Sequence, residues 1–166
     1  PRWEGKTAAR TDRQDAGRQL AKKLGKYKNA KECIAIGLPR GGVVTAFEVA
    51  KELMIPLDVL TPRKLRAPYN PELGIGAVTD KDALYLNQEL IQTLNVSDEY
   101  LNNELLIKQK EAAERLQKYR KNKPPLDFKD KTVILIDDGL ATGATMMAAI
   151  LKCKKDNAKK MIVAVP

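Results

Sequence analysis

The chain has 166 residues, 43% of them hydrophobic and 31% charged, which is typical of one globular domain rather than a disordered segment. It has no histidine and only two widely separated cysteines, so it lacks the usual residues of a zinc site, of histidine catalysis and of an activated thiol. No apolar run is long enough for a membrane span and no secretory signal is visible, so we expect a cytoplasmic protein without a membrane partner.

The net charge of +9 is unevenly distributed, because residues 1–31 and 108–131 are basic while residues 32–107 are acidic. A basic surface can attract nucleic acid, but only 5% of the residues are aromatic, which leaves few side chains to stack on bases. We therefore expect a solvated, lysine-rich surface rather than a nucleic-acid interface.

Residues 1–11 have no periodic pattern and predict an extended or poorly ordered arm, which Trp3 would anchor. The segment from Asp12 to Leu24 is amphipathic and predicts a helix, with Thr11 or Asp12 as its N-cap. Gly25 is expected to end this helix, since glycine accepts the backbone conformation that follows a last turn.

A strand, a loop and a helix are predicted next, over residues 33–37, 38–42 and 43–53. Arg40 offers a planar fork of donors for phosphate, and Gly41-Gly42 leaves the backbone open to a closely bound anion. A tight turn that carries a surface arginine would have the same sequence, so this loop alone does not decide between a binding site and a turn.

A second strand is predicted over residues 57–61, between Pro56 and Pro62. Arg63 and Lys64 follow directly, which places two cations at the carboxyl end of a strand. If the sheet is parallel, they share an edge with Arg40. The alternative for Lys64 is an ordinary surface lysine.

Residues 66–76 are dense in proline and glycine and predict a mobile loop that could close as a lid, with Glu72 near its tip. A hairpin is predicted from residues 77–79 and 83–86. A long helix should run from the cap Ser97 to about residue 121, with one apolar stripe. We expect this stripe to pack in the core, and a homodimer surface is the alternative. Its members are Leu101, Leu105, Ala112, Leu116 and Tyr119.

The most informative segment begins with an apolar, β-branched run at residues 132–136, which predicts a strand buried on both faces. Asp137 and Asp138 follow it, then a small-residue loop over residues 139–145 and a helix from Met146 to about residue 155. Such a loop and helix start can bind a phosphate through backbone N–H groups, while two carboxylates suit sugar hydroxyls or hydrated Mg²⁺. A sugar phosphate would use both halves.

Residues 134–145, Ile-Leu-Ile-Asp-Asp-Gly-Leu-Ala-Thr-Gly-Ala-Thr, resemble the phosphoribosyl pyrophosphate (PRPP) motif of type I phosphoribosyltransferases. Gly139 departs mildly from the motif, since an aliphatic residue is commoner there. The resemblance implies that Asp137 and Asp138 bind the ribose 2′- and 3′-hydroxyls. It also implies a 5′-phosphate site made of Ala141, Thr142, Gly143, Ala144 and Thr145.

The same resemblance assigns the remaining site residues. A pyrophosphate site is implied at Arg40, Gly41, Gly42, Arg63 and Lys64. Asp137, Asp138, Arg40 and Lys64 are the implied catalytic residues, and Glu72 is a lid candidate for proton transfer or base binding. Mg²⁺ is the implied cofactor, held through PRPP and water without direct protein ligands. The implied reaction is transfer of the phosphoribosyl group to a nitrogen nucleophile, such as a nucleobase, with release of pyrophosphate.

These elements predict an α/β fold, a three-layer, open and mainly parallel sheet with helices on both faces and a small hairpin or lid insertion. A last strand is expected over residues 161–165, and residues 1–166 would form a single domain that lacks a C-terminal part of the family fold. Two alternatives remain open: a non-catalytic PRPP- or nucleotide-binding regulator that contacts nucleic acid, and a receiver-like domain. The receiver's acidic pair belongs on its first strand. The acceptor base is not revealed.

Overall fold

The computed structural model describes residues 4–81, 83–140 and 143–166, and it describes side chains from residue 12 onward within those ranges. The chain forms two compact units that are interleaved in sequence. The first unit comprises Pro1–Val59, Pro125–Leu140 and Asn157–Pro166, and the second comprises Leu60–Pro124 and Ala141–Asp156. The expectation of a single domain stays a prediction.

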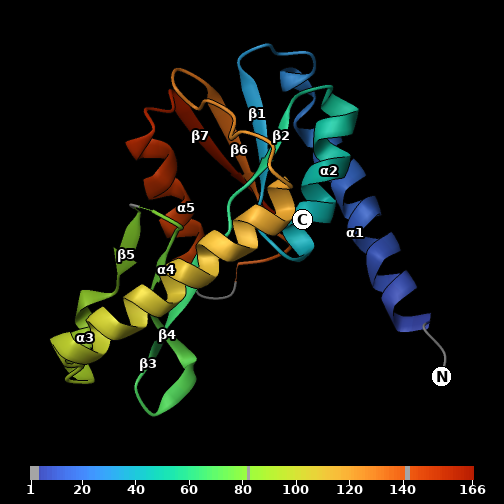
Figure 1. The fold of residues 1–166 in the computed structure, drawn as a ribbon. Coiled ribbons are helices and arrows are strands. Elements are labelled where there is room, and N and C mark those ends of the chain that lie inside the picture. The colour runs from blue at the N-terminus through green and yellow to red at the C-terminus, as the bar shows by residue number, and fades with distance from the viewer. Residues whose placement is uncertain (1–3, 82, 141–142) are drawn as a thin grey trace. The chain divides into compact units, whose positions relative to one another are not determined.

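The first unit is built on a four-stranded parallel sheet with the strand order β2-β1-β6-β7 (Figure 1). Its strands are β1 Cys33–Gly37, β2 Leu57–Val59, β6 Thr132–Ile136 and β7 Lys160–Ala164. Gly37 is paired with Ile136, and Ile136 with Ala164, so these three strands end together at one edge. The predicted α/β class and parallel sheet are confirmed, with β2 two residues shorter than expected and β7 shifted by one residue.

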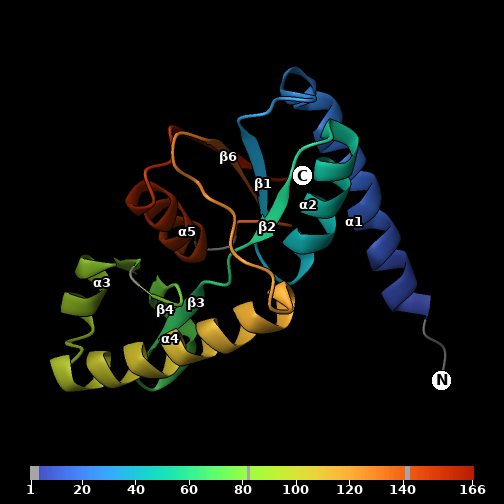
Figure 2. The ribbon, with the colours of Figure 1, turned by 45° about the horizontal axis from the view of Figure 1, so that its top comes forward.

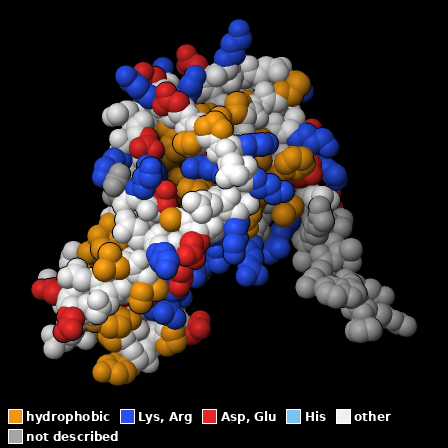
Figure 3. Space-filling model, in the orientation of Figure 1, with side chains coloured by type: hydrophobic (Ala, Val, Ile, Leu, Met, Phe, Trp, Pro, Cys, Tyr) orange, Lys and Arg blue, Asp and Glu red, His pale blue; other side chains and the backbone are white. Residues whose placement is uncertain are grey.

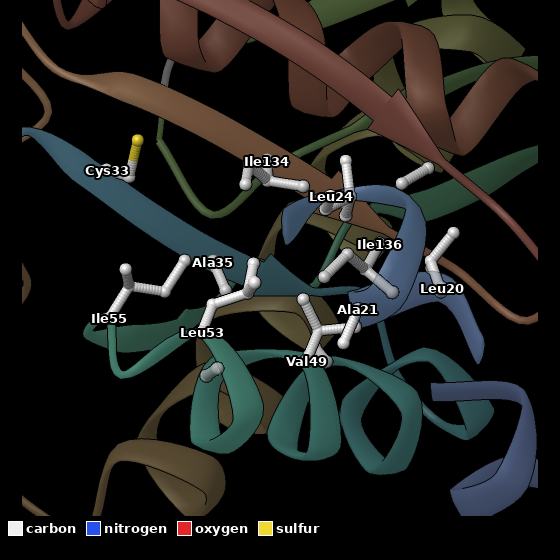
Figure 4. Packing of buried hydrophobic residues seen from close by; sticks show 13 residues of the cluster. Leu20, Ala21, Leu24, Cys33, Ala35, Val49, Leu53, Ile55, Ile134 and Ile136 are labelled. Atoms are coloured by element: carbon white, nitrogen blue, oxygen red, sulfur yellow. The ribbon is translucent and has the colours of Figure 1, made fainter. Parts of the chain in front are cut away.

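The core of the first unit lies between this sheet and helix α2, Gly41–Leu53 (Figure 4). Ala35, Ile134 and Ile136 point from β1 and β6 into a cluster with Val49 and Leu53 of α2. The intervening residues of the two central strands are buried as well, among them Ile34, Val133 and Leu135. Burial on both faces is the expected state of a parallel strand that is apolar throughout, as predicted for residues 132–136.

Helix α1, Glu4–Lys23, lies beside α2 in the first unit (Figures 1 and 2). The prediction of an extended arm is therefore wrong for residues 4–11, and residues 11 and 12 lie inside the helix rather than at its N-cap. Residues 4–11 contain no proline and include two alanines, so the helix meets no strong breaker there. Trp3 lies outside the described residues. A short 3₁₀ turn, Gly25–Tyr27, follows α1 after Leu24.

The second unit contains an antiparallel sheet with the order β3-β4-β5 and three helices. The strands are β3 Arg63–Ala67, β4 Asn70–Val78 and β5 Leu84–Leu86, and the helices are α3 Gln88–Thr93, α4 Asp98–Arg120 and α5 Ala144–Lys155. The pairing of β4 with β5 confirms the predicted hairpin. Helix α3 was not predicted.

The predicted mobile loop over residues 66–76 is wrong, because most of it belongs to the β3–β4 hairpin, which turns at Pro68 and Tyr69. The hairpin buries Leu65, Ile75 and Val78 in a cluster that also contains apolar residues of α3 and α4. This burial outweighs the low strand propensity of the local proline and glycines. Register shifts near Arg66 accommodate them within the ladder.

The long helix agrees with its sequence pattern. Ser97 caps α4, since its Oγ accepts a hydrogen bond from the Tyr100 backbone N–H at 3.2 Å. The predicted stripe packs inward at Leu101, Leu105, Ala112 and Leu116. Tyr119 does not, because 38% of it is exposed.

The surface seen in Figure 3 carries Lys and Arg side chains in several separate groups, with acidic and apolar side chains between them. We therefore keep the expectation of a solvated basic surface. In the part of the chain that the structure describes, no helix combines the length and the apolar character that a membrane crossing requires.

Candidate functional site

The acid pair of the first unit lies directly after β6, where the sheet ends. The Asp137 backbone N–H donates to the Ala164 carbonyl at 3.4 Å, and the Asp138 backbone N–H donates to Asp137 Oδ1 at 2.8 Å. Partial burial raises the pKa of Asp137 to about 6, an effect that outweighs the opposing hydrogen bond from the Asp138 backbone. Near neutral pH the site therefore holds a carboxylate that is costly to ionise, beside a more exposed one.

The predicted pyrophosphate loop lies against this acid pair within the first unit. A β-carbon on Gly41 would overlap the Asp138 carboxylate. A β-carbon on Gly42 would be 2.7 Å from the Ile136 carbonyl oxygen and 2.9 Å from the Asp137 α-carbon. The structure thus brings both glycines to the acids, and it supplies a packing reason for glycine at each position.

Arg40 precedes helix α2 and has an exposed side chain. The peptide bond between Pro39 and Arg40 is cis. The Leu38 N–H donates to the Ile136 carbonyl at 3.0 Å, so the start of this loop is hydrogen-bonded to the end of β6. Arg40 is followed directly by the two glycines, and both the anion-binding loop and the role of Arg40 in pyrophosphate binding stay predictions.

Arg13 of α1 is part of this site and was not predicted. Its Nη2 donates to Asp138 Oδ2 at 3.1 Å, with 43% of the arginine side chain and 39% of the aspartate side chain exposed. Its Nε would lie 2.8 Å from a β-carbon on Gly41. The contact joins residues far apart in sequence, so no local sequence pattern could predict it.

Close packing of α1 on α2 places Arg13 over the loop. Gly17, one turn after Arg13, has no room for a side chain, because a β-carbon there would be 2.7 Å from Glu48 Cβ and 2.9 Å from the Thr45 carbonyl oxygen. The glycine therefore allows the two helices to approach closely. Its presence within an otherwise helical pattern was the one available signal that this helix has a specific neighbour.

The phosphate half of the predicted motif falls in the second unit. Helix α5 begins at Ala144, two residues earlier than expected, and Gly143 precedes it with a φ of 76°. Ala144 and Thr145 thus lie in the first helical turn, at the positive end of the helix dipole. Ala141 and Thr142 lie outside the described residues. The predicted 5′-phosphate site stays a prediction.

Arg63 and Lys64 both form hydrogen bonds with residues of the second unit. Lys64 Nζ donates to the Glu72 carbonyl at 2.9 Å, across the β3–β4 hairpin, and Glu72 itself is exposed. Arg63 donates through Nε at 3.0 Å and through Nη2 at 2.8 Å to Glu111 Oε2 on α4. The roles predicted for Arg63, Lys64 and Glu72 stay predictions. The ion pair of Arg63 with Glu111 was not predicted from the sequence.

Glu111 is the centre of an ionic cluster on α4. It also accepts from Lys108 Nζ, at 3.1 and 3.2 Å. Partial burial would raise the pKa of Glu111, but the hydrogen bonds from Lys108 and Arg63 outweigh it and the pKa is lowered. The cluster fastens α4 to β3.

A metal ion would find few protein ligands here. Among residues 4–81, 83–140 and 143–166, no three His, Cys, Asp or Glu side chains are grouped so that they could hold one. The two neighbouring carboxylates of Asp137 and Asp138 suit a hard cation such as Mg²⁺, which keeps several waters and commonly binds through one or two carboxylates and substrate phosphates.

A family model described as "Phosphoribosyl transferase domain" matches residues 9–166. A Mycobacterium tuberculosis (strain H37Rv) protein, named provisionally as a phosphoribosyl transferase, is 38% identical over 158 residues, which cover 93% of this chain and 35% of that protein. The chain therefore spans about a third of the length of the curated relatives it matches.

Solved structures are similar to this chain over most of its length. The protein TT1426 from Thermus thermophilus is 38% identical with a TM-score of 0.75, and the match covers 93% of this chain and 73% of that one. A purine phosphoribosyltransferase from Pyrococcus horikoshii is 23% identical with a TM-score of 0.52, covering 94% of this chain and 71% of that one. The similarity to the Pyrococcus horikoshii structure shows a shared fold and nothing more.

Proposed function

Because the chain belongs to the phosphoribosyl transferase domain family, we propose that it transfers the 5-phosphoribosyl group of PRPP to a nitrogen nucleophile, a nucleobase, with release of pyrophosphate. The observation that carries this proposal is the contact between the acid pair and the glycine loop. Asp137 and Asp138 lie at the carboxyl edge of a parallel sheet, directly against Gly41 and Gly42. Ligands of open α/β sheets bind at this edge.

The acids would hold the ribose. Each carboxylate is a pure hydrogen-bond acceptor when ionised, so the pair can accept from two vicinal hydroxyls. Partial burial raises the pKa of Asp137 to about 6, so its ionised form is under-stabilised in the free protein and would be stabilised by hydroxyl donors. The same negative charge would offset the positive charge that develops on the sugar as the C1–oxygen bond breaks.

The leaving group would be held by cations and backbone donors. When the C1–oxygen bond breaks, its electron pair leaves with pyrophosphate. The nucleophile's nitrogen forms the new bond to C1 and then loses its proton to solvent water. Arg40 is exposed beside the glycine loop, where it could neutralise charge on the departing oxygen. The family resemblance assigns the 5′-phosphate to the segment that includes Ala144 and Thr145, where the positive end of the α5 dipole would favour an anion.

Asp137 and Asp138 are the residues that would hold Mg²⁺, through water, and the ion would neutralise pyrophosphate oxygens when bound. Positioning and charge neutralisation supply most of the catalysis in this scheme, because a dissociative displacement needs little covalent help from the protein.

Binding and turnover test the proposal separately. PRPP with Mg²⁺ should raise the melting temperature of the wild-type protein by mass action. Calorimetry should give a dissociation constant for PRPP that is at least tenfold higher in Asp138→Asn than in the wild type. A panel of purine and pyrimidine bases should then identify one that releases pyrophosphate. Binding without release for every base would favour the non-catalytic regulator, and no binding would reject both.

A further inference from the structure

The side chain of Arg13 belongs to the acid site, but the reaction scheme above leaves it unused. It comes from α1, whereas the predicted site residues of the first unit lie after β1 and β6. Its guanidinium meets two of them, with Nη2 on the Asp138 carboxylate at 3.1 Å and Nε over Gly41. The Arg13 guanidinium is thus hydrogen-bonded to Asp138 and lies beside the glycine loop.

The Arg13 contact fixes the direction of a side chain that would otherwise be free to turn. Asp138 is 39% exposed, so solvent leaves its carboxylate space to rotate. Arg13 Nη2 donates one charge-assisted hydrogen bond to Asp138 Oδ2, and this bond favours one orientation of the carboxylate. An ion pair this exposed adds little to folding stability. We therefore attribute to it the orientation of the Asp138 carboxylate rather than stabilisation of the fold.

The position of Arg13 is itself built into the fold. Gly17 allows α1 to lie close to α2, as its missing β-carbon would clash with both Glu48 and Thr45. Arg13 is one turn earlier on the same helix, so this packing places its side chain over the start of α2. If α1 packed loosely on α2, the Arg13 side chain would not be held at one position beside Gly41 and Asp138.

From these contacts we propose that Arg13 is a positioning residue of the PRPP site, which acts by orienting the Asp138 carboxylate toward the ribose hydroxyls. The inference rests on the proposed function. It assigns α1 a part in ligand binding, in addition to its part in the core. It also means that the effect of Arg13 on affinity passes through Asp138.

A double-mutant cycle tests this dependence directly. The dissociation constant of PRPP with Mg²⁺ is measured by calorimetry for the wild type, Arg13→Gln, Asp138→Asn and the double variant. We expect Arg13→Gln to weaken binding roughly three- to tenfold in the wild-type background and less than twofold in the Asp138→Asn background. Arg13→Lys should restore most of the affinity, since a lysine ammonium can donate the same single charged hydrogen bond to Asp138 Oδ2.

Arg18→Gln is the matched control. Arg18 lies on the same helix, is 53% exposed, and pairs with Asp15 at 2.9 Å and with the buried Glu48 carboxylate at 3.9 Å. The variant therefore removes the same charge from α1 together with ion pairs that do not involve Asp138. Its PRPP affinity should stay within twofold of the wild type. Equal losses for Arg18→Gln and Arg13→Gln would overturn the proposal in favour of a general charge effect.

The remaining outcomes separate the two hypotheses. Tight binding to the wild type with additive losses in the cycle would overturn the role of Arg13 and leave the proposed function intact. No binding of PRPP or of ribose 5-phosphate to the wild type would overturn both. Coupling in the cycle, with rescue by lysine, supports the positioning role.

Discussion

The carboxylate of Asp138 occupies the space in which a side chain on Gly41 would begin. The two residues come from loops that follow neighbouring parallel strands, β1 and β6, whose ends are in register at Gly37 and Ile136. The pairing explains why the first helical residue of α2 is a glycine, independently of any ligand. It also makes position 41 a direct probe of the acid site.

Gly41→Ala should displace the Asp138 carboxylate and weaken PRPP binding, because a methyl group cannot share its position. We expect at least a tenfold loss of affinity in calorimetry, with a destabilisation of about 1–3 kcal/mol in urea unfolding. Gly25→Ala is the control, since a β-carbon there meets nothing within 4 Å. Unchanged affinity in Gly41→Ala would mean that Asp138 can move without consequence for the ligand.

Gly17→Ala separates helix propensity from helix packing. Propensity alone predicts that alanine stabilises a helix interior by about 1 kcal/mol over glycine. The contacts with Glu48 and Thr45 predict the opposite sign, a loss of about 1–3 kcal/mol, because α1 must move away from α2. Urea unfolding of the two proteins decides the sign, and a stabilised variant would show that the helices can part freely.

The raised pKa of Asp137 predicts a specific pH dependence of the free energy of unfolding. This pKa rises from 3.8 to about 6 on folding, so the folded state binds more protons than the unfolded state between these values. Stability should therefore fall as the pH rises from 4 to 6, and the penalty should remain above pH 6. Asp137→Asn removes the penalty.

In urea unfolding, the gain in stability from Asp137→Asn should be larger at pH 7.5 than at pH 4, by roughly 1–2 kcal/mol after allowance for solvent screening. Asp12→Asn, a change at an exposed position of α1, controls for the loss of one negative charge. An equal gain at both pH values would contradict the raised pKa.

Ser97→Ala should destabilise the protein by about 1 kcal/mol, since Ser97 Oγ is the acceptor for the Tyr100 backbone N–H at the start of α4. Ser97→Asp should retain most of the stability, because a carboxylate accepts the same hydrogen bond and interacts favourably with the helix dipole. Thermal unfolding of the three proteins measures both effects. A loss as large in Ser97→Asp as in Ser97→Ala would mean that the cap is not formed.

The parallel sheet could be predicted from the sequence because each of its strands carries its signal locally. Residues 33–37 and 132–136 are short apolar runs bounded by polar or small residues, and both strands have the predicted bounds. The acids and glycines follow those runs directly. Their meeting at one edge then follows from parallel pairing alone.

The β3–β4 hairpin could not be predicted in the same way. Its β4 segment, from Asn70, contains proline and two glycines, and local propensity favours a loop. What makes it a strand is the burial of Leu65 and Ile75 in a cluster with α3 and α4 residues that lie later in the chain. Propensity was overridden by tertiary packing.

The part played by Arg13 was equally hidden. An arginine on the polar side of an amphipathic helix normally faces solvent, and nothing within α1 distinguishes Arg13 from Arg18. Only the fold brings Arg13 to Asp138, through a glycine contact between two helices. Likewise, Arg63 was predicted from its place after a strand, and its ion pair with Glu111 depends on α4.

Pyrophosphate release from PRPP in the presence of Mg²⁺ and a panel of nucleobases is the most direct measurement of the central claim. We predict release that depends on one base and falls at least a hundredfold in Asp138→Asn, while Arg18→Gln keeps the wild-type rate. Release that is independent of every base, or equal in the wild type and Asp138→Asn, would contradict the assignment of the acid pair to phosphoribosyl transfer.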